Sequence, residues 1–180
     1  MITGERLAEQ AIKGGYLGKP YSEMDCQGFV EKVIYDLGIR KPNGTAYNWK
    51  GSNSMYRNYF QWRGTKSECE KAFGLIPQGA LVFKCRNDGG EKEKGYTDGL
   101  GNFYHVGIYV GSEQGNIINS TAGGVQFAKT LNGWSHVSLL SFIDYTGATV
   151  PGTGTKNRIL SLINDMKKLI SELEAVTNEI

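Results

Sequence analysis

The sequence predicts an α+β fold, in which an amphipathic helix packs on an antiparallel sheet. The helix is expected at residues 26–37, where apolar side chains recur at helical spacing and form one face. The sheet is expected from short β-rich segments separated by turn residues, at residues 80–84, 104–110, 116–121, 124–129 and 135–140.

Local signals define the ends of the first half of this fold. Asp25 is well placed to cap the start of the helix at residues 26–37, and Gly38 is well placed to end it. Helical spacing also predicts a helix over residues 3–13, which Gly14 and Gly15 stop.

The segment 40–78 is rich in aromatic residues and is expected to form a helical insertion along one side of a cleft. Within it we expect one short helix from about Ser54 and another over residues 67–73. Residues 86–102 are charged and glycine-rich, and they predict a long loop.

Composition excludes several classes of protein. The 180 residues carry 20 basic and 18 acidic side chains, and a formal charge of +2 is too balanced to predict binding to nucleic acid. No stretch has the roughly 18–20 apolar residues that cross a membrane. The first residues lack the pattern of a secretory signal, so a substrate outside the cell would be reached through a lost signal, a phage particle or lysis.

Three parts are expected along the chain: a domain over 1–150, a linker at 151–155 and an amphipathic helix at 156–180. The helix carries an a/d heptad seam of apolar side chains: Ile159, Leu162, Met166, Leu169, Leu173, Val176 and Ile180. Such a seam predicts either an assembly helix that joins copies of the chain or a helix docked on its own domain.

The cysteine content indicates neither a zinc site nor a disulfide framework. Cys26, Cys69 and Cys85 are odd in number and show no C-x-x-C spacing. A Cys69–Cys85 bridge is an open alternative, and it would leave Cys26 free.

Cys26 and His105 are the residues that predict chemistry. Cys26 lies at the expected start of a helix, and His105 lies at the start of a strand that is expected to be buried in the core. The positive end of a helix and a nearby imidazolium both lower the pKa of a thiol, and the backbone N–H groups at the helix start can stabilise an oxyanion. This pair predicts a cysteine nucleophile with a histidine base.

The sequence segments around these residues resemble those of the NlpC-type family of bacterial cell-wall cysteine peptidases, a branch of the papain-like enzymes. The resemblance covers roughly residues 5–145 and rests on segments that occur in order: Pro20-Tyr21, Asp25-Cys26-Gln27-Gly28-Phe29-Val30, Gly38-Ile39, Ile76-Pro77-Gln78-Gly79-Ala80-Leu81-Val82-Phe83 and His105-Val106-Gly107-Ile108-Tyr109-Val110-Gly111. It implies a papain-like fold and an endopeptidase that cleaves the stem peptides of peptidoglycan, typically between γ-D-glutamate and a diamino acid. It also implies action at the cell wall, outside the cytoplasmic membrane, and is compatible with a phage or prophage lytic or tail-associated module.

The resemblance further implies a third catalytic group on the strand after His105. Asn119 occupies that position, with Ser120 and Thr121 as weaker substitutes. If the turn at residues 112–115 pairs Gly107 with Asn119, then Asn119 falls on the face of His105, one diagonal step away. A slip of one residue would send it to the other face.

Other residues near the nucleophile complete the expected site. The resemblance assigns Tyr21 a hydroxyl near the oxyanion or the substrate, with packing as the alternative, and it places Asp25 and Gln27 beside the same site. The chain departs from the family pattern at Gln27, at Ala80 and at Ser22-Glu23-Met24, which leaves the substrate specificity open. His136, the other histidine, is expected to be a sheet or rim residue.

Two alternatives remain at this point. An N-acetylmuramoyl-L-alanine amidase of the related CHAP type would need the same three groups. A non-catalytic wall-binding or assembly module, with the heptad helix as its functional part, belongs to a different class. No metal and no organic cofactor are expected, because the two histidines have no ligand spacing and thioester hydrolysis needs neither.

Overall fold

The computed structural model describes residues 1–86, 96 and 98–147. Residues 1–148 make up one compact unit of the chain. The expected linker at 151–155 and heptad helix at 156–180 lie outside the described residues, as does most of the expected loop at 86–102. Within the described part, no helix is long and apolar enough to cross a membrane.

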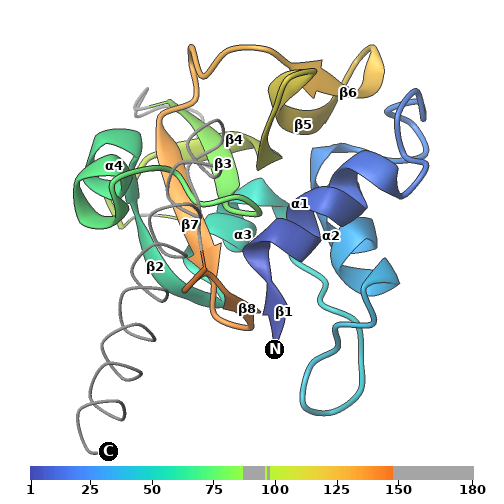
Figure 1. Ribbon diagram of the computed structural model, residues 1–180, viewed down its shortest axis with the longest axis horizontal. Helices are drawn as coiled ribbons and strands as arrows, with labels where there is room; N and C mark the ends of the chain where they lie inside the picture. Colours follow the sequence, from blue (N-terminus) through green and yellow to red (C-terminus); the bar gives the residue numbers. More distant parts are fainter. Residues whose placement is uncertain (87–95, 97, 148–180) are drawn as a thin grey trace, which may run out of the picture. The chain divides into compact units, whose positions relative to one another are not determined.

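Helices and strands alternate irregularly along the chain, as expected for an α+β fold (Figure 1). The described helices are α1 (Gly4–Lys13), α2 (Cys26–Asp36), α3 (Gly51–Arg57) and α4 (Lys66–Phe73). The described strands are β1 (Ile2–Thr3), β2 (Phe60–Thr65), β3 (Leu81–Arg86), β4 (Asn102–Ser112), β5 (Gly115–Thr121), β6 (Gly124–Ala128), β7 (His136–Leu140) and β8 (Ile143–Asp144).

Six strands form one antiparallel sheet in the order β2-β7-β3-β4-β5-β6, and β1 pairs with β8 in a separate parallel pair. The expected strands at residues 80–140 are therefore confirmed as an antiparallel sheet, within one or two residues at most ends. The strands β3, β4, β5 and β6 form an uninterrupted meander, and β7, which comes late in the chain, lies on the other side of β3, between β3 and β2.

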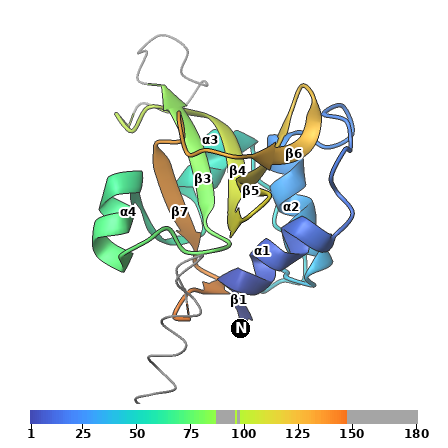
Figure 2. The same ribbon diagram turned by 45° about the horizontal axis from the view of Figure 1, so that its top comes forward.

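The two faces of the sheet bury different helices. The helices α1, α2 and α3 pack on β4, whereas α4 packs against β2 and β7 (Figure 2). Alternation along β3 shows the division, because Leu81 and Phe83 join the core under α1–α3, while Val82 joins the smaller core near α4. The sheet is thus covered on both sides, and its central strands are apolar on both faces.

The helix α2 forms as its sequence predicts. The Asp25 carboxylate accepts a hydrogen bond of 2.6 Å from the backbone N–H of Gly28, which caps the first turn. Phe29, Val30, Val33 and Ile34 are at most 1 % exposed, so the apolar face is buried. Gly38, at φ 75°, takes the left-handed conformation that ends the helix.

The segment 40–78 differs from the expected helical insertion. The helices α3 and α4 are present, but β2 lies between them and pairs with β7 as an edge strand of the main sheet. The physical reason is the alternation of Phe60 and Trp62 with polar Gln61 and Arg63, a period of two that favours a strand. Thr65 then ends β2 and starts α4 through a capping box with Glu68.

Candidate active site

The Cys26 thiol lies at the start of α2, against the strand that carries His105. The pairing of β4 with β5 ends at Gly107 and Asn119. The backbone N–H of Val106, which precedes Gly107 in β4, lies close enough to the Cys26 sulfur to lower the pKa of the thiol. The Ser120 hydroxyl donates to the carbonyl oxygen of Met24, which fastens the segment before the nucleophile to β5. Cys26 thus lies beside the point where the pairing of β4 with β5 ends.

His105 and Asn119 are brought together as the predicted register requires. Gly107 pairs with Asn119, so the condition set from the sequence is confirmed, although the register shifts between Tyr109 and the Ser112–Gly115 pair at the turn. The distance from His105 Nε2 to Asn119 Oδ1 is 2.8 Å. Asn119 is 3 % exposed, and its Nδ2 donates to the carbonyl oxygen of Gln126 over 3.4 Å, which orients Oδ1 toward the imidazole.

This hydrogen bond fixes the tautomer of the imidazole. An amide oxygen only accepts, so His105 Nε2 must carry the hydrogen. In the neutral ring Nδ1 then keeps its lone pair and can take a proton from a thiol. Asn119 therefore holds both the orientation and the protonation pattern that a general base needs.

A β-bulge in β4 aims His105 at the site. Lys84 pairs with His105 but Cys85 pairs with Phe103, so Tyr104 is an extra residue in β4. Phe103 and Val106 both enter the core under α1–α3, although they are three residues apart. The bulge reverses the alternation between them and lets Tyr104 and His105 face the same hollow.

That hollow has a volume of about 290 Å³ and is lined by Tyr21, Lys84, Tyr104, His105, Ser120, Thr121 and Ala122. Its lining joins the nucleophile loop, through Tyr21, to the ends of β3, β4 and β5. Tyr104 is 41 % exposed and Tyr21 is 43 % exposed, so the hollow opens to solvent. His105 lines this hollow, whereas Cys26 is not among the described residues that line it.

The Cys26 thiol and the His105 imidazole are each shifted toward the neutral form. Burial raises the pKa of the Cys26 thiol, and the nearby Asp25 carboxylate raises it further. The N–H groups of Val106 and Gln27 and the Tyr21 hydroxyl lower this pKa, although burial outweighs them. Burial also lowers the pKa of His105, against the opposing effect of Asn119, and the Lys84 charge lowers it further. These shifts favour a protonated Cys26 thiol and a neutral His105 imidazole as the resting forms.

The start of α2 leaves two backbone donors available near the sulfur. Gly28 N–H is taken by the Asp25 carboxylate, and Phe29 N–H donates to the Asp25 carbonyl oxygen over 2.9 Å. The N–H groups of Cys26 and Gln27 precede these and lie at the positive end of the helix. They are the donors that an oxyanion formed at Cys26 would meet.

The other predicted site residues have different surroundings. Tyr21 lies beside Cys26, and that neighbouring thiol is one cause of the raised pKa of Tyr21, after burial. Asp25 is engaged in capping, and its charge opposes a thiolate or oxyanion nearby. The Gln27 side chain points elsewhere, because its Nε2 donates to Glu31 Oε1 and to the Trp49 carbonyl oxygen over 2.7 and 2.6 Å. Gln27 can therefore act at the site through its backbone N–H.

His136 and the other two cysteines lie apart from this arrangement. The His136 ring packs edge-on against Tyr56 and Phe103, and its Nδ1 lies 2.9 Å from Ser135 Oγ. Its place in β7, among core aromatic residues, agrees with the predicted role in the sheet. In the described part of the chain Cys69 and Cys85 form no disulfide, so the alternative of a bridge between them is not realised.

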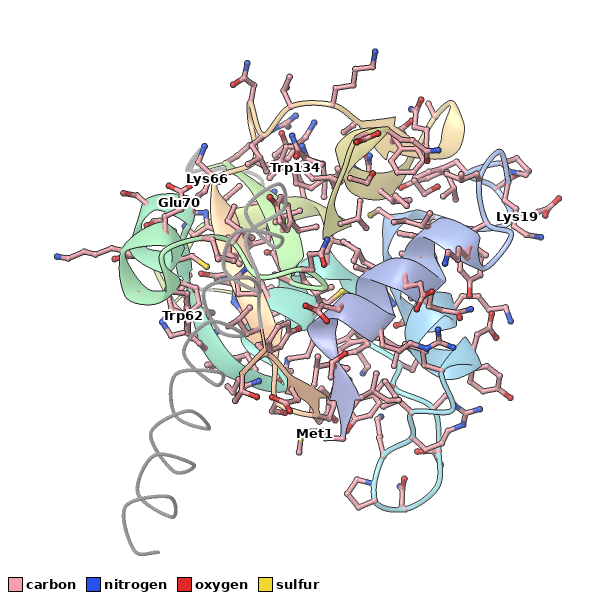
Figure 3. All side chains as sticks on the ribbon, viewed as in Figure 1. Met1, Lys19, Trp62, Lys66, Glu70 and Trp134 are labelled. Atoms are coloured by element: carbon pink, nitrogen blue, oxygen red, sulfur yellow. The ribbon has the colours of Figure 1, made fainter. Side chains whose placement is uncertain are left out.

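Lys84 and Trp134 are the residues at the site that sequence reasoning missed. Trp134 lies in the loop that leads into β7 (Figure 3), 5.3 Å from the His105 ring between centroids and 5.1 Å from Lys84 Nζ. The strand register would have revealed Lys84, because it pairs directly with His105. No local sequence pattern predicts that Trp134 lies at the site, because its position there depends on the order of strands in the sheet.

Comparison with known proteins adds no relative. No family model matches the chain, no curated protein matches it, and no solved structure matches its fold. Among the described residues, no group of three or more His, Cys, Asp or Glu side chains could hold a metal ion.

Proposed function

We propose that this protein is a cysteine peptidase of papain-like, NlpC-type character that cleaves the stem peptides of peptidoglycan. The observation that carries the proposal is the hydrogen bond between His105 and Asn119, on the strand against which the Cys26 thiol lies. The order of motifs around these residues supports the substrate class through the family resemblance. As an endopeptidase, the protein would cleave the bond between γ-D-glutamate and the diamino acid.

The geometry supports a general-base route. His105 Nδ1 takes the thiol proton while the sulfur attacks the scissile carbonyl carbon, and Asn119 holds the resulting imidazolium through Nε2–H. The N–H groups of Cys26 and Gln27 and the Tyr21 hydroxyl donate hydrogen bonds to the oxyanion. The imidazolium returns the proton to the leaving amine, the C–N bond breaks and a thioester at Cys26 remains. Water, deprotonated by His105, then hydrolyses the thioester and restores the thiol.

A digest of purified peptidoglycan tests this proposal. We expect wild-type protein to release fragments cut between D-glutamate and the diamino acid, identified by mass spectrometry, and Cys26→Ala to release none. Cys85→Ser is the matched control, because it removes a cysteine thiol that does not line the hollow and should leave the products unchanged. Stem peptides with a free L-alanine amino terminus would instead identify the CHAP-type amidase. No Cys26-dependent product from several wall types would refute hydrolysis and favour the non-catalytic module.

We also propose that residues 156–180 join copies of the chain through their heptad seam. The support is the sequence pattern itself, three uninterrupted heptads that follow a linker rich in glycine and threonine. Sedimentation of the full chain should show an oligomer, and Leu169→Glu should convert it to a monomer. A monomeric wild type that Leu169→Glu merely destabilises would favour the docked helix.

A further inference from the structure

Lys84 is a cation held directly beside the catalytic histidine. It is the cross-strand partner of His105, and side chains of such pairs leave the sheet on the same face, with Cβ atoms roughly 4.5–5.5 Å apart. It lines the same hollow as His105 and Tyr21. Lys84 is thus a residue of the substrate-facing surface.

The surroundings of Lys84 hold the ammonium in place without neutralising it. Its Nζ lies 5.1 Å from the centre of the Trp134 ring, a cation–π contact that restricts a long and flexible side chain. In the described part of the chain no carboxylate forms an ion pair with it, and none lines the hollow. Trp134 is 4 % exposed, so the supporting ring is itself fixed by packing.

An ordered, half-buried and unpaired cation at a substrate surface favours an anionic group on the substrate. Charge-assisted hydrogen bonds to a carboxylate are roughly twice as strong as neutral ones. A carboxamide of the same shape offers one oxygen acceptor and no charge. The site should therefore distinguish a free carboxylate from its amide.

We propose that Lys84 binds a free carboxylate of the substrate close to the scissile carbonyl, and that it thereby selects peptides in which this carboxylate is not amidated. The inference deepens the proposed function and rests on it. In the proposed substrate, the group concerned is the α-carboxylate of the D-glutamyl residue, which a short aliphatic chain separates from the scissile γ-carbonyl. Peptides with D-isoglutamine at this position carry the amide instead.

Paired synthetic stem peptides, with D-glutamate or D-isoglutamine, test the selection. Wild type should cleave the D-glutamate peptide with a kcat/KM roughly tenfold to a hundredfold higher, the effect of one charge-assisted hydrogen bond. Lys84→Met should abolish that preference by raising KM for the D-glutamate peptide alone, and Lys84→Arg should retain it. Lys71→Met, on α4, is the control for loss of one positive charge.

Two results would overturn the proposal. One is a wild type that cleaves both peptides equally, and the other is a Lys84→Met variant that loses the same factor on both. The second result would mean that Lys84 acts only through His105 or through packing. All rates are compared on the pH plateau above the titration of His105, so that the influence of Lys84 on that residue does not enter.

Binding measurements separate this inference from the proposed hydrolysis. Calorimetry on Cys26→Ala protein should show a lower Kd for the D-glutamate peptide than for the D-isoglutamine peptide, and the added Lys84→Met should remove the difference. Selective binding with no cleavage by wild type would refute the proposed function and keep the carboxylate site. Cleavage without selective binding would keep the function and refute the site.

Discussion

In the proposed mechanism, Asn119 determines whether His105 can act as a base, because it holds both the ring orientation and the tautomer. Asn119→Ala should leave a mobile ring in either tautomer and lower kcat by about a hundredfold, the cost of a misplaced catalytic group. The measurement is steady-state hydrolysis of a stem peptide. Asn116→Ala is the matched control on the same strand, since Asn116 bonds only to the Lys129 carbonyl oxygen among the described residues. Equal losses in both variants would contradict a role specific to Asn119.

The lowered pKa of His105 sets the acid limb of the pH profile. Since catalysis needs the neutral ring, kcat/KM should fall only as the pH drops below that depressed pKa, and it should be retained at pH values where an ordinary histidine is already protonated. Removing the Lys84 charge makes imidazolium easier to form, so Lys84→Met should move the acid limb to higher pH. Lys84→Arg should leave it in place.

Several other titratable groups face the same region and bear on this profile. Cys26 lies against β4, while Tyr21 and Tyr104 line the hollow. The first two contribute to the alkaline limb, because burial raises the pKa of each. An acid limb that stays unmoved in Lys84→Met would contradict the electrostatic coupling between Lys84 and His105.

At the scale of elements, the pairing of β4 with β5 positions His105 and Asn119, the proposed base and its partner. Gly107 lies opposite Asn119, and a Cβ at Gly107 would come within 2.7 Å of Ile117 Cγ2, 2.9 Å of the Ile118 carbonyl oxygen and 3.0 Å of Asn119 Cβ. Gly107→Ala must therefore push β5 away from β4. The Asn119 amide would move with it, away from His105.

This displacement predicts a coupled loss. Gly107→Ala should reduce the free energy of unfolding by about 1–3 kcal/mol, as overpacking of a core does, and should reduce kcat at temperatures where the protein remains folded. Gly123→Ala, in the turn between β5 and β6, is the control, because its Cβ would meet only ordinary contacts from 3.5 Å. Chemical denaturation and peptide hydrolysis provide the two readouts. A destabilised variant with wild-type kcat would show that β5 yields without moving Asn119.

The elements that could be predicted from the sequence are those with a strong local period. Residues 26–37 predict α2 through their spacing, cap and terminal glycine. The pairing of Gly107 with Asn119 could be predicted only as a condition, because a register shift between Tyr109 and Ser112 separates it from the Ser112–Gly115 pair at the turn. The bulge at Tyr104 could not be predicted, because an extra residue in β4 shows only against its partner β3. The period of two at residues 60–63 could have indicated the strand β2, but its pairing with β7, which is distant in the chain, could not be predicted. The position of Trp134 could not be predicted either, because it follows from the pairing of β7 with β3.

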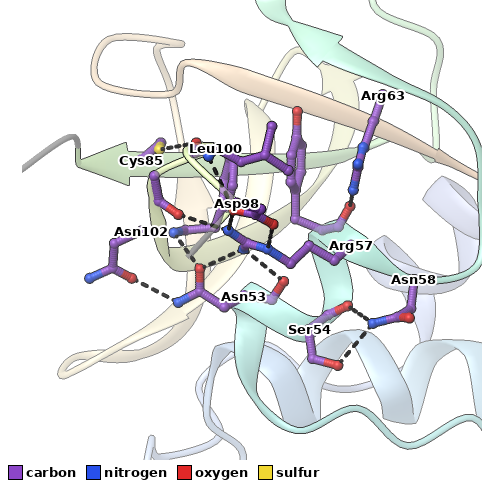
Figure 4. Close-up of polar contacts among 12 residues, drawn as sticks. Asn53, Ser54, Arg57, Asn58, Arg63, Cys85, Asp98, Leu100 and Asn102 are labelled. Atoms are coloured by element: carbon purple, nitrogen blue, oxygen red, sulfur yellow. Dashed lines mark hydrogen bonds and ion pairs between the residues drawn. The ribbon is translucent and has the colours of Figure 1, made fainter. Parts of the chain in front are cut away.

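At the scale of the whole molecule, Arg57 ties α3 to the start of β4. Its guanidinium donates to Asp98 over 2.7 and 2.9 Å, to the Gly101 carbonyl oxygen and to Asn53 Oδ1, while that same oxygen accepts from the Phe103 N–H (Figure 4). The Arg57 side chain is 8 % exposed. The network therefore fixes the segment that enters the bulge at Tyr104 and, after it, His105.

Loss of this network should reduce global stability more than activity. Arg57→Met removes the charge and leaves several acceptors without a donor, so we expect a loss of about 2–4 kcal/mol in the free energy of unfolding. Urea denaturation followed by tryptophan fluorescence measures it. Arg40→Met is a control, because Arg40 bonds near the C-terminal end of α2, at the carbonyl oxygens of Tyr35 and Ile39.

The pH dependence identifies the carboxylate as the partner. The Arg57 guanidinium holds the pKa of Asp98 well below its usual range, so the ionised carboxylate stabilises the folded state at pH values above about 4, where the unfolded carboxyl also ionises. Its contribution is lost as the pH falls below that value toward the folded pKa. The difference in stability between wild type and Asp98→Asn should thus be constant near neutral pH and shrink in acid. In an Arg57→Met background the same substitution should have little effect at any pH, and an undiminished difference there would mean that Asp98 acts through another group.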